Sequence, residues 1–494
     1  MVRFVQLLAL LMLAPFGAHA SAQGNSPSAR LNLSPCTVPK TTEDGAAADE
    51  KVPARCGTFT VPEDRRTGRG RMLALKTIVI PSRSANPGLP IFMFAGGPGQ
   101  ATTDQAPIIA GLWHPQQHDV VFMDLRGTDR ATGLDCGMEG SDDDPQSYLR
   151  PFLGAGAGYA KCRDKLSSRA DLKQYTTSIS VQDVDDLRKA LGYSRINIEA
   201  GSYGTRAAIE YIRQFGRHVH AAALYSLVPP ESRSPLAHAS AAQRAYDQMV
   251  KQCEIEPACR AAYPNLKADV GTILRRLRSK PASVAVPHPA TGAQVRVTLD
   301  DADFAGALRV MLYNIDNQRR IPLLLHRALA GDYTPFATTA LQSNRNFAKI
   351  LRVGLLFSVS CSEDAWRIRP GEPERESHGT FLGTQRVKGQ LAACSVWPRG
   401  RVPAGFYDPP VSDVPVLLVS GNLDPVTPPY WGEVTQRRFR NALHVVVETG
   451  THVPINPCLD EMQKRLFATG SLKGLDASCV NEAKAPPFAL PDKS

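Results

Sequence analysis

Short, nearly continuous runs of apolar residues recur along the chain. The runs are Leu73–Ile80, Ile91–Phe94, Val120–Met123, Ile196–Ile198, Ala221–Leu227, Val414–Val419 and Leu443–Val447. Such runs are typical of strands that are buried on both faces of a parallel sheet. Between two of them, Val184–Leu191 carries apolar residues three and four positions apart, as in an amphipathic helix, and Gly192 ends this pattern. Strands that alternate with helices predict an α/β fold with a mostly parallel central sheet.

The alternation stops between about Pro229 and Gly400. Helical patterns in this part of the chain cover Ala241–Cys253, Asp301–Asn314 and Ile321–Ala330. Proline and glycine punctuate the rest, and sheet-like runs resume at Val414. We therefore expect one α/β core that is interrupted by a mainly helical insertion, which covers the active edge of the sheet as a cap.

The first twenty residues have the features of a secretory signal peptide. Arg3 supplies a positive charge, Phe4–Phe16 is almost wholly apolar, and Ala18-His19-Ala20 has the small residues of a signal peptidase site. A transmembrane anchor is the alternative, but the apolar run is too short to span a bilayer and a cleavage site follows it. We expect cleavage after Ala20, export to the periplasm or the medium, and no membrane insertion of the mature chain.

These patterns divide the chain into five parts. They are a signal peptide (1–20), an irregular lead-in (21–55), the first part of the core (56–230), a mostly helical cap insertion (231–400) and the second part of the core (401–494). The 494 residues are 43% hydrophobic and 21% charged, which is enough for a large core. The net charge of +10 comes from scattered lysine and arginine without a nucleic-acid-binding module, so we attribute it to solubility and expect no nucleic-acid partner.

Ten cysteines, an even number, lie beyond the signal segment, and in an exported protein this predicts disulfides. They form the sequence-local pairs Cys36/Cys56, Cys136/Cys162, Cys253/Cys259, Cys361/Cys394 and Cys458/Cys479. Pairing of neighbours is the simplest hypothesis, although spacing alone does not determine connectivity. Zinc is the competing interpretation, but the chain has no C-x-x-C or H-E-x-x-H segment to support it.

Residues 195–215 have the pattern strand, sharp turn, helix, with Ser202 at the turn. Gly201 and Gly204 flank this serine, and Ala200 lies two positions before it. The G-x-S-x-G turn of hydrolases needs small neighbours, because its nucleophile adopts a strained backbone conformation. Here Ala200 takes the place of the first glycine. The alternative is an ordinary serine that caps a glycine-rich helix start.

A serine hydroxyl needs a base that accepts its proton, and folds with this turn place an acid and then a histidine downstream of the serine. Asp424 follows the apolar run in PVLLVSGNLDPVTP, and His452 follows the one in LHVVVETGTHVP. Both therefore lie in loops after strands, where open α/β sheets build their sites. Singly, they are common as a turn aspartate and a surface histidine. In this order they predict a triad of Ser202 as nucleophile, His452 as general base and Asp424 as the acid that orients the histidine.

The tetrahedral intermediate of acyl transfer needs two backbone N–H donors. One is expected from Tyr203, the residue after the nucleophile. The other is expected from the glycine-rich loop 94–99, with Gly97 preferred over Gly96, since glycine lets the backbone approach a substrate closely. The alternative is a plain turn between a strand and a helix.

Several motifs of this chain resemble one known family. They are G-G-P-G at 96–99, D-x-R-G at 124–127, G-S-Y-G-T at 201–205, D-P-V-T-P at 424–428 and G-T-H at 450–452. The family is the secreted tripeptidyl-aminopeptidase-like branch of the prolyl aminopeptidase family of α/β-hydrolase serine peptidases. The resemblance runs from about Cys56 to Cys479 and implies an α/β-hydrolase that releases short N-terminal fragments from peptides. The chain departs from the family at Asp129 and Ala131, which replace a glycine and a serine, and at Ala95, where prolyl aminopeptidases often have a histidine.

An aminopeptidase must bind a positively charged N-terminus, and in a partly dry pocket that ammonium needs a carboxylate. The family resemblance places an acidic residue two positions after a cysteine, which matches Glu363 after Cys361. We expect Glu363 to be the anchor, with Asp364 as the second candidate and a tether from Cys361 to Cys394 holding both in place. The alternative is that both are solvated surface charges.

The sequence thus predicts an exported serine hydrolase that cleaves peptide bonds near a free N-terminus through an acyl-enzyme, without a metal or organic cofactor. A carboxylesterase with the same triad is one alternative, and a non-catalytic binding protein on the hydrolase scaffold is another. An epoxide hydrolase or a dehalogenase is excluded, because these enzymes need a carboxylate at the position of Ser202. The expected partner is a peptide or small acyl substrate.

Overall fold

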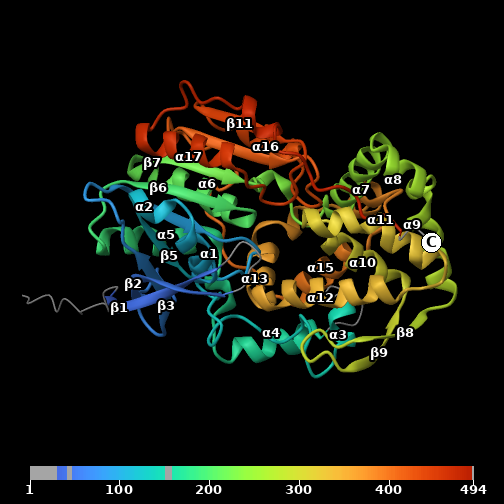
Figure 1. Ribbon diagram of the computed structural model, residues 1–494. Coiled ribbons are helices and arrows are strands. Elements are labelled where there is room, and N and C mark those ends of the chain that lie inside the picture. Colours follow the sequence, from blue (N-terminus) through green and yellow to red (C-terminus); the bar gives the residue numbers. More distant parts are fainter. Residues whose placement is uncertain (1–29, 42–46, 151–157, 492–494) are drawn as a thin grey trace, which may run out of the picture.

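The centre of the computed structural model, which describes residues 30–41, 47–150 and 158–491, is a nine-stranded sheet (Figure 1). Its strands are β1 (Arg30–Thr41), β2 (Ala47–Pro62), β3 (Met72–Ile80), β4 (Gly88–Phe94), β5 (His118–Met123), β6 (Ile196–Gly201), β7 (Val219–Tyr225), β10 (Val416–Gly421) and β11 (Ala442–Val447). Their order is β1-β2-β3-β5-β4-β6-β7-β10-β11. Neighbours from β5 to β11 are parallel, and β1, β2 and β3 join antiparallel at one edge. The expected α/β fold with a mostly parallel sheet is confirmed.

The irregular lead-in expected at 21–55 is wrong for the part that the structure describes. Residues 30–41 and 47–62 are the antiparallel pair β1–β2, and Cys36 and Cys56 join the two strands. Prolines and charges hide this strand pattern in the sequence, and an edge strand tolerates them because one of its sides needs no hydrogen-bond partner. The predicted signal peptide lies outside the described residues.

Helices cover both faces of the sheet. One face packs against α5 (Thr177–Ala190), α6 (Tyr203–Phe215) and α16 (Pro429–Gln436). The other packs against α1 (Ala106–Gly111), α2 (His114–Gln117) and α17 (Pro457–Thr469). Because both faces are buried, the central strands have the continuous apolar runs that made them predictable. No helix in the described part of the chain is long and apolar enough to cross a membrane.

The segment between β7 and β10 is mostly helical. It contains α7 (His238–Ile255), α8 (Pro257–Ala262), α9 (Leu266–Ser279), α10 (Asp301–Met311), α11 (Ile315–Leu329), α12 (Thr334–Ile350), α13 (Val353–Glu363), α14 (Glu372–Ser377), α15 (Gln385–Val396) and the hairpin β8–β9 (Ala282–Pro287 and Gln294–Leu299). Helices α7 to α12 and the hairpin enclose a hydrophobic core of their own, with Phe304 and Phe336 stacked 3.9 Å apart. Side chains of α3 (Gln146–Leu149) and Phe488 of the C-terminal tail also enter this core.

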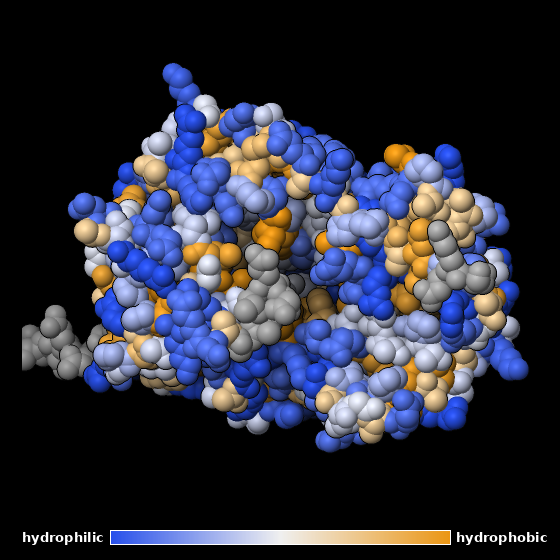
Figure 2. All heavy atoms as spheres, viewed as in Figure 1, coloured by the Kyte–Doolittle hydropathy of each residue, from blue (hydrophilic) through white to orange (hydrophobic). Residues whose placement is uncertain are grey.

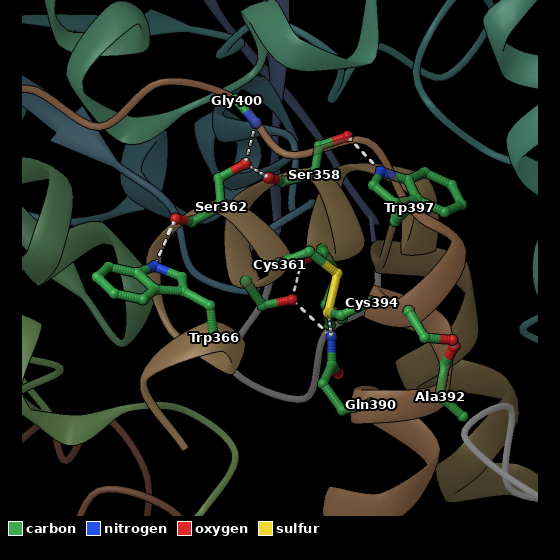
Figure 3. The surroundings of a disulfide bond; sticks show 12 residues. Ser358, Cys361, Ser362, Trp366, Gln390, Ala392, Cys394, Trp397 and Gly400 are labelled. Carbon is green, nitrogen blue, oxygen red and sulfur yellow. Dashed lines mark hydrogen bonds between the residues drawn. A yellow bond between two sulfur atoms is a disulfide. The ribbon is translucent and has the colours of Figure 1, made fainter. Parts of the chain in front are cut away.

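Two helices of the insertion pack on the sheet-bearing part instead. Phe357 of α13 lies in the same buried cluster as residues of α5 and α6, and so does Trp397 just after α15; α4 (Tyr159–Ser167) adds to it. The disulfide between Cys361 and Cys394 joins α13 to α15, and serine and tryptophan side chains form hydrogen bonds around it (Figure 3). Helices α13 and α15 therefore connect the sheet to the helical part.

All ten cysteines form disulfides in the neighbouring pairs expected. The pairs are Cys36–Cys56, Cys136–Cys162, Cys253–Cys259, Cys361–Cys394 and Cys458–Cys479. Their spacing does not show that some of them belong to the hydrophobic cores. Cys162 of α4 is only 4% exposed and lies in the buried cluster that also contains α5 and α6, and Cys253 and Cys259 are buried in the core of the helical part.

Candidate active site

The turn between β6 and α6 holds Ser202 in a strained conformation. The backbone of Ser202 has φ 55° and ψ −129°, outside the regions that L-residues usually adopt. Its N–H donates to the carbonyl of Tyr225 over 2.9 Å. A Cβ atom on Gly204 would lie 2.2 Å from the carbonyl oxygen of Phe94, so only glycine fits there. Ala200 is still within β6 and paired with neighbouring strands, which is why an alanine is accommodated at that position.

Asp424 follows β10 and His452 follows β11, and the two side chains meet. His452 Nδ1 lies 2.8 Å from Asp424 Oδ2, and Asp424 is fully buried. Burial alone would raise the pKa of Asp424, but the charge of His452 and hydrogen bonds from His452 and Thr427 hold it well below its usual range. An ionised Asp424 accepts a hydrogen bond from Nδ1–H, which leaves Nε2 of His452 as the atom that can act as a base.

Three residues that the sequence did not single out support this pair. Ser226, just after β7 with φ 57°, donates its hydroxyl to Asp424 Oδ2 over 2.8 Å and accepts from the N–H of Val453 over 2.7 Å. Thr427 donates its hydroxyl to Asp424 over 2.6 Å. The ring of Tyr313 lies 4.9 Å from the ring of His452, edge to face. A serine at the end of an apolar strand was the only available signal for Ser226, since its partners are about 200 residues away in the sequence.

Ser202 and His452 line the same cavity, whose volume is about 700 Å³. Among the described residues, the structure contains a hydrogen bond between His452 and Asp424 but none between His452 and Ser202. Hydrogen bonds of this kind are often long before a substrate binds. The three predicted residues are thus brought to one edge of the sheet by β6, β10 and β11, and the catalytic roles of all three remain a prediction.

The expected N–H donors also lie at Ser202. No described residue accepts a hydrogen bond from the N–H of Gly97 or of Tyr203, whereas the N–H of Gly96 donates to Gln100 Oε1 over 3.1 Å. Gly97 has φ 108°, and a Cβ atom on it would lie 2.5 Å from the N atom of Gly99. Of the two glycines, Gly97 is the one whose N–H is free to bind an oxyanion.

Two cavities of different character meet at Ser202. The larger one is an open groove whose rim includes the exposed apolar residues Ile108, Leu112 and Ile455. The smaller one has a volume of about 80 Å³ and lies between Ser202 and the helical part of the chain. Figure 2 shows the surface hollowed between the sheet-bearing part and the helical part, with hydrophobic residues gathered at the hollow.

The cysteines that the sequence singled out are not brought to this site. None of the ten lines either of the two cavities. Cys162 is enclosed in the cluster beneath α5 and α6 and bonded to Cys136, and Cys458 and Cys479 join the start of α17 to the C-terminal tail. Their role in the described structure is therefore to hold elements together, and Cys361–Cys394 is the only described pair of which both members lie on helices that also carry residues of the smaller cavity.

The two acidic residues at the end of α13 are buried, so they are not solvated surface charges. Glu363 is 0% and Asp364 2% exposed. Both carboxylate oxygens of Glu363 bind Thr177, one at its N–H over 2.7 Å and one at its hydroxyl over 2.9 Å. Asp364 Oδ2 accepts from Arg206 Nη1 over 2.6 Å. Its Oδ1 makes no hydrogen bond with the described residues, although the backbone N–H of Ser234 lies near enough to lower the pKa of Asp364. Asp364 lines the smaller cavity, and Glu363 does not.

The pKa values of both acids are shifted upward. Burial raises the pKa of Glu363 to about 7, although the nearby charge of Arg206 and the hydrogen bonds from Thr177 act against it. Burial also raises the pKa of Asp364, again against Arg206, which lowers it. Arg367 lies close enough to lower the pKa of Asp364 slightly, but its guanidinium stacks on Tyr407 at 4.1 Å. A second positive charge near these carboxylates would favour their ionised forms.

The chain is similar to known proteins over most of its length. Residues 379–479, which include Asp424 and His452, match the model of a family described as "TAP-like protein". The chain is 24% identical to "Serine protease Hip1" of Mycobacterium tuberculosis over 479 residues, which covers 87% of this chain and 88% of that protein. It is also 24% identical to "Tripeptidyl aminopeptidase" of Streptomyces lividans over 491 residues, which covers 90% of this chain and 87% of that protein.

The chain is a serine hydrolase of the α/β-hydrolase fold. The resemblance to the tripeptidyl-aminopeptidase-like hydrolases is confirmed by these relatives. A solved structure of a proline iminopeptidase-related protein from Thermus thermophilus is 16% identical and covers 85% of this chain and 99% of that chain, with a TM-score of 0.36. The sheet order of this hydrolase and the turn at Ser202 are themselves those of the α/β-hydrolase fold.

The loop after β5 is where the hydrolase departs from the sequence pattern of the family. Asp129 Oδ1 accepts hydrogen bonds from the N–H of Ala131 over 2.9 Å and from the N–H of Thr132 over 2.7 Å. Asp129 thus closes this turn through its side chain, a turn-forming role that aspartate often has. Within the described part of the hydrolase, no three His, Cys, Asp or Glu side chains form a group that could hold a metal ion.

Proposed function

We propose that this hydrolase is an aminopeptidase that releases short N-terminal fragments from peptides through an acyl-enzyme at Ser202. The observation that carries the proposal is the position of Ser202 between a small cavity with a buried, partly unpaired carboxylate and an open groove. A substrate with its N-terminus in the small cavity and its remaining chain in the groove presents one peptide bond to Ser202. The relatives named as a tripeptidyl aminopeptidase and a serine protease support the same conclusion.

The proposed reaction follows from the atoms that meet at the turn. Ser202 Oγ attacks the carbonyl carbon while His452 Nε2 takes its proton, and the ionised Asp424 stabilises the imidazolium that forms. The N–H groups of Gly97 and Tyr203 bind the negative oxygen of the tetrahedral intermediate. When the C–N bond breaks, His452 returns the proton to the leaving amine, and a water molecule activated by the same histidine then releases the N-terminal fragment.

The substrate ammonium is proposed to bind Asp364. Its Oδ1 is a buried acceptor without a hydrogen bond to any described residue, and an ammonium group supplies donors and the opposite charge. Glu363 lies behind it, bonded to Thr177 and 3.5 Å from the same Arg206 guanidinium that binds Asp364. Asp364 is therefore proposed as the contact and Glu363 as the residue that adds negative charge and positions α13.

The segment between β7 and β10 is proposed to act as the cap. Arg309 and Tyr313 of this segment line the small cavity, and so does Asp364. A cap that closes one side of the site limits how many residues fit before the scissile bond, which is what an aminopeptidase of this kind requires. We also propose that the protein is exported, because five disulfides suit an oxidising compartment.

The test compares a peptide amide that has a free N-terminus with its N-acetylated twin. We expect the wild type to cleave the free peptide at least about tenfold faster in kcat/KM, and Asp364→Asn to lose this preference mainly through a higher KM. Asp413→Asn, an exposed acid paired with Arg440, is the matched control and keeps the preference. Equal cleavage of both peptides would remove Asp364 from the site.

Simple esters and a fluorophosphonate probe, tested beside these two peptides, distinguish the proposal from its alternatives. If simple esters are hydrolysed while both peptides remain intact, the carboxylesterase alternative replaces the proposal. If a fluorophosphonate probe fails to label the protein, it is a binding protein on a hydrolase scaffold, because the serine is then not activated.

A further inference from the structure

Two arginines of the helical segment face the small cavity without a carboxylate partner. Arg309 comes from α10 and Arg386 from α15, and both line the cavity that Ser202 and Asp364 also line. Neither arginine takes part in any of the ion pairs that the described residues form. The other lining arginine, Arg206, is by contrast paired with Asp364.

Most of the N–H donors on these two guanidinium groups have no acceptor among the residues that the structure describes. A guanidinium has five N–H donors. Arg309 donates from Nη2 to the hydroxyl of Tyr313 over 2.6 Å, and its buried Nε has no partner although the residue is only 4% exposed. Arg386 donates from Nε to His238 Nδ1 over 2.9 Å. His238 in turn lies 2.9 Å from the hydroxyl of Ser234, and these contacts orient Arg386 without neutralising it.

The two positive charges also affect one another. Burial and the charge of Arg309 lower the pKa of Arg386 to about 9. Unpaired, desolvated cations are unfavourable, and a planar guanidinium pair is well suited to bind a carboxylate through two parallel hydrogen bonds. The free protein thus holds two cations ready for an anion that it does not itself provide.

A third cavity lies next to the small one. Arg309 and Arg386 line both of these cavities. One acid, Glu139, lines this third cavity, but its carboxylate accepts a hydrogen bond from the N–H of Val353 over 2.8 Å. Burial, together with the nearby charge of Asp135, raises the pKa of Glu139 to about 7. Glu139 is therefore held by the backbone and is not the counter-ion of either arginine.

One of the two arginines, Arg309, is linked to His452 through the ring of Tyr313. Arg309 lies over the ring of Tyr313, 5.2 Å from its centre, and the same ring lies 4.9 Å from that of His452. Tyr313 thus separates the guanidinium of Arg309 from the catalytic histidine. The open groove, by contrast, is not lined by either arginine. An anion at the arginine pair belongs to the part of the substrate that occupies the small cavity.

We propose that Arg309 and Arg386 bind a carboxylate of the substrate, so that the enzyme prefers peptides with an aspartate or glutamate side chain in the fragment that it releases. This assignment of the carboxylate to the N-terminal fragment rests on the proposed function. A C-terminal carboxylate of a very short peptide has the same chemistry and is the second possible source. With Asp364 and the arginine pair in one cavity, the bound fragment carries its ammonium and its carboxylate to separate partners.

The experiment measures kcat/KM for two series of peptides with a free N-terminus. In the first series, glutamate replaces glutamine at each position before the cleaved bond; in the second, a C-terminal carboxylate replaces the amide. We expect the wild type to prefer glutamate at one position by about tenfold or more in kcat/KM, and Arg386→Gln to cleave the glutamate and glutamine peptides with equal kcat/KM. Arg386→Lys keeps the positive charge but lacks the planar guanidinium that binds a carboxylate through two hydrogen bonds. This variant should recover part of the preference for glutamate.

Lys388→Gln is the control, because Lys388 lies on the same helix, is exposed and pairs with Glu374 over 3.0 Å. A wild-type enzyme without a preference for the carboxylate in either series overturns the proposal, and this outcome needs no variant to fold. The wild type can instead prefer only the peptides with a C-terminal carboxylate, and Arg386→Gln can lose that preference. This outcome supports the arginine site and shows that its ligand is the C-terminal carboxylate of the peptide.

A pair of nitrophenyl esters distinguishes this proposal from the proposed function. One is the glutarate half-ester with a free carboxylate, and the other is its uncharged amide. If no peptide is cleaved but the charged ester is preferred about tenfold and Arg386→Gln removes that preference, the peptidase assignment fails and the arginine site stands. If peptides are cleaved from the free N-terminus without any carboxylate preference, the arginine site fails and the peptidase assignment stands.

Discussion

At the scale of single residues, the proposed chemistry depends on Ser202 as the nucleophile, on His452 as its base and on the ionised Asp424 that orients the histidine. Because the hydroxyl of Ser202 forms the acyl-enzyme, Ser202→Ala should lower kcat/KM at least about a thousandfold. His452→Ala should lower kcat/KM by a similar factor, and Asp424→Asn by a somewhat smaller one. Thermal melts should show that each variant is folded, and a Ser202→Ala protein with wild-type turnover would refute the mechanism.

Ser226 offers a sharper test of the geometry, since it contacts the acid but not the substrate. Its hydroxyl bridges Asp424 and the N–H of Val453, next to the histidine. Ser226→Ala leaves both groups without this partner, at a cost of roughly 1–3 kcal/mol for a buried donor. We expect kcat to fall about tenfold with little change in KM. Ser395→Ala, an exposed serine of α15, is the control, and identical kinetics for both variants would exclude the bridge.

The triad candidates could be predicted because their order along the chain and their local motifs are both constrained by the fold. Ser226 and the pair Arg309 and Arg386 could not, because each acts through partners that are far away in the sequence. Nothing local distinguishes an arginine that faces a cavity from an arginine in solvent. Glu363 and Asp364 could be predicted as a pair, but only burial and hydrogen bonds show which of them reaches the cavity.

At the scale of elements, predictability follows burial. The central strands are covered on both faces and have continuous apolar runs, so each expected run falls on a strand. The edge strand β1 and its neighbour β2 carry proline and charge, and their pairing depends on partner strands and not on a local pattern. Helix α13 was missed because it is buried on all sides and so has no amphipathic period, which a buried strand also lacks.

The disulfide between Cys361 and Cys394 gives the element-scale prediction. It joins α13, which ends next to Asp364, to α15, which carries Arg386. Replacing both cysteines by alanine should lower stability by about 2–4 kcal/mol and raise KM for free peptides, while KM for simple esters stays the same. Replacing Cys253 and Cys259, which close a short loop in the helical part, should leave both KM values unchanged. Equal KM effects of the two double variants would contradict this coupling.

At the scale of the whole molecule, buried charge links stability to pH. Burial raises the pKa of Glu363 from 4.5 to about 7, so between these values the unfolded chain releases a proton that the folded chain retains. The stability associated with this group is complete below pH 4.5 and is lost as the pH rises to about 7. Glu363→Gln should therefore gain melting temperature relative to the wild type between about pH 5 and pH 8.

Glu374→Gln is the control for this measurement, because Glu374 is exposed and its pKa is lowered, chiefly by its hydrogen bond to Lys388. It should show no such gain across the same range. A melting-temperature difference between Glu363→Gln and the wild type that does not change with pH would show that Glu363 ionises normally in the folded protein.

The division into a sheet-bearing part and a helical part was also predictable at this scale, since the alternation of runs stops and resumes in the sequence. Its internal organisation was not, because Phe488 and α3 enter the helical core from outside the insertion, and α13 and α15 leave it for the sheet. The two cavities form where these parts meet, so no local pattern indicates them.

The central claim is that Ser202 reacts with the carbonyl of a peptide whose free N-terminus is bound at the same site. A peptidyl diphenyl phosphonate and its N-acetylated twin test it directly, through the rate at which each labels the protein and the residue that mass spectrometry finds modified. We expect both to modify Ser202, and the free compound to react at least about tenfold faster. Modification of another residue, or equal rates for the two compounds, would contradict the account.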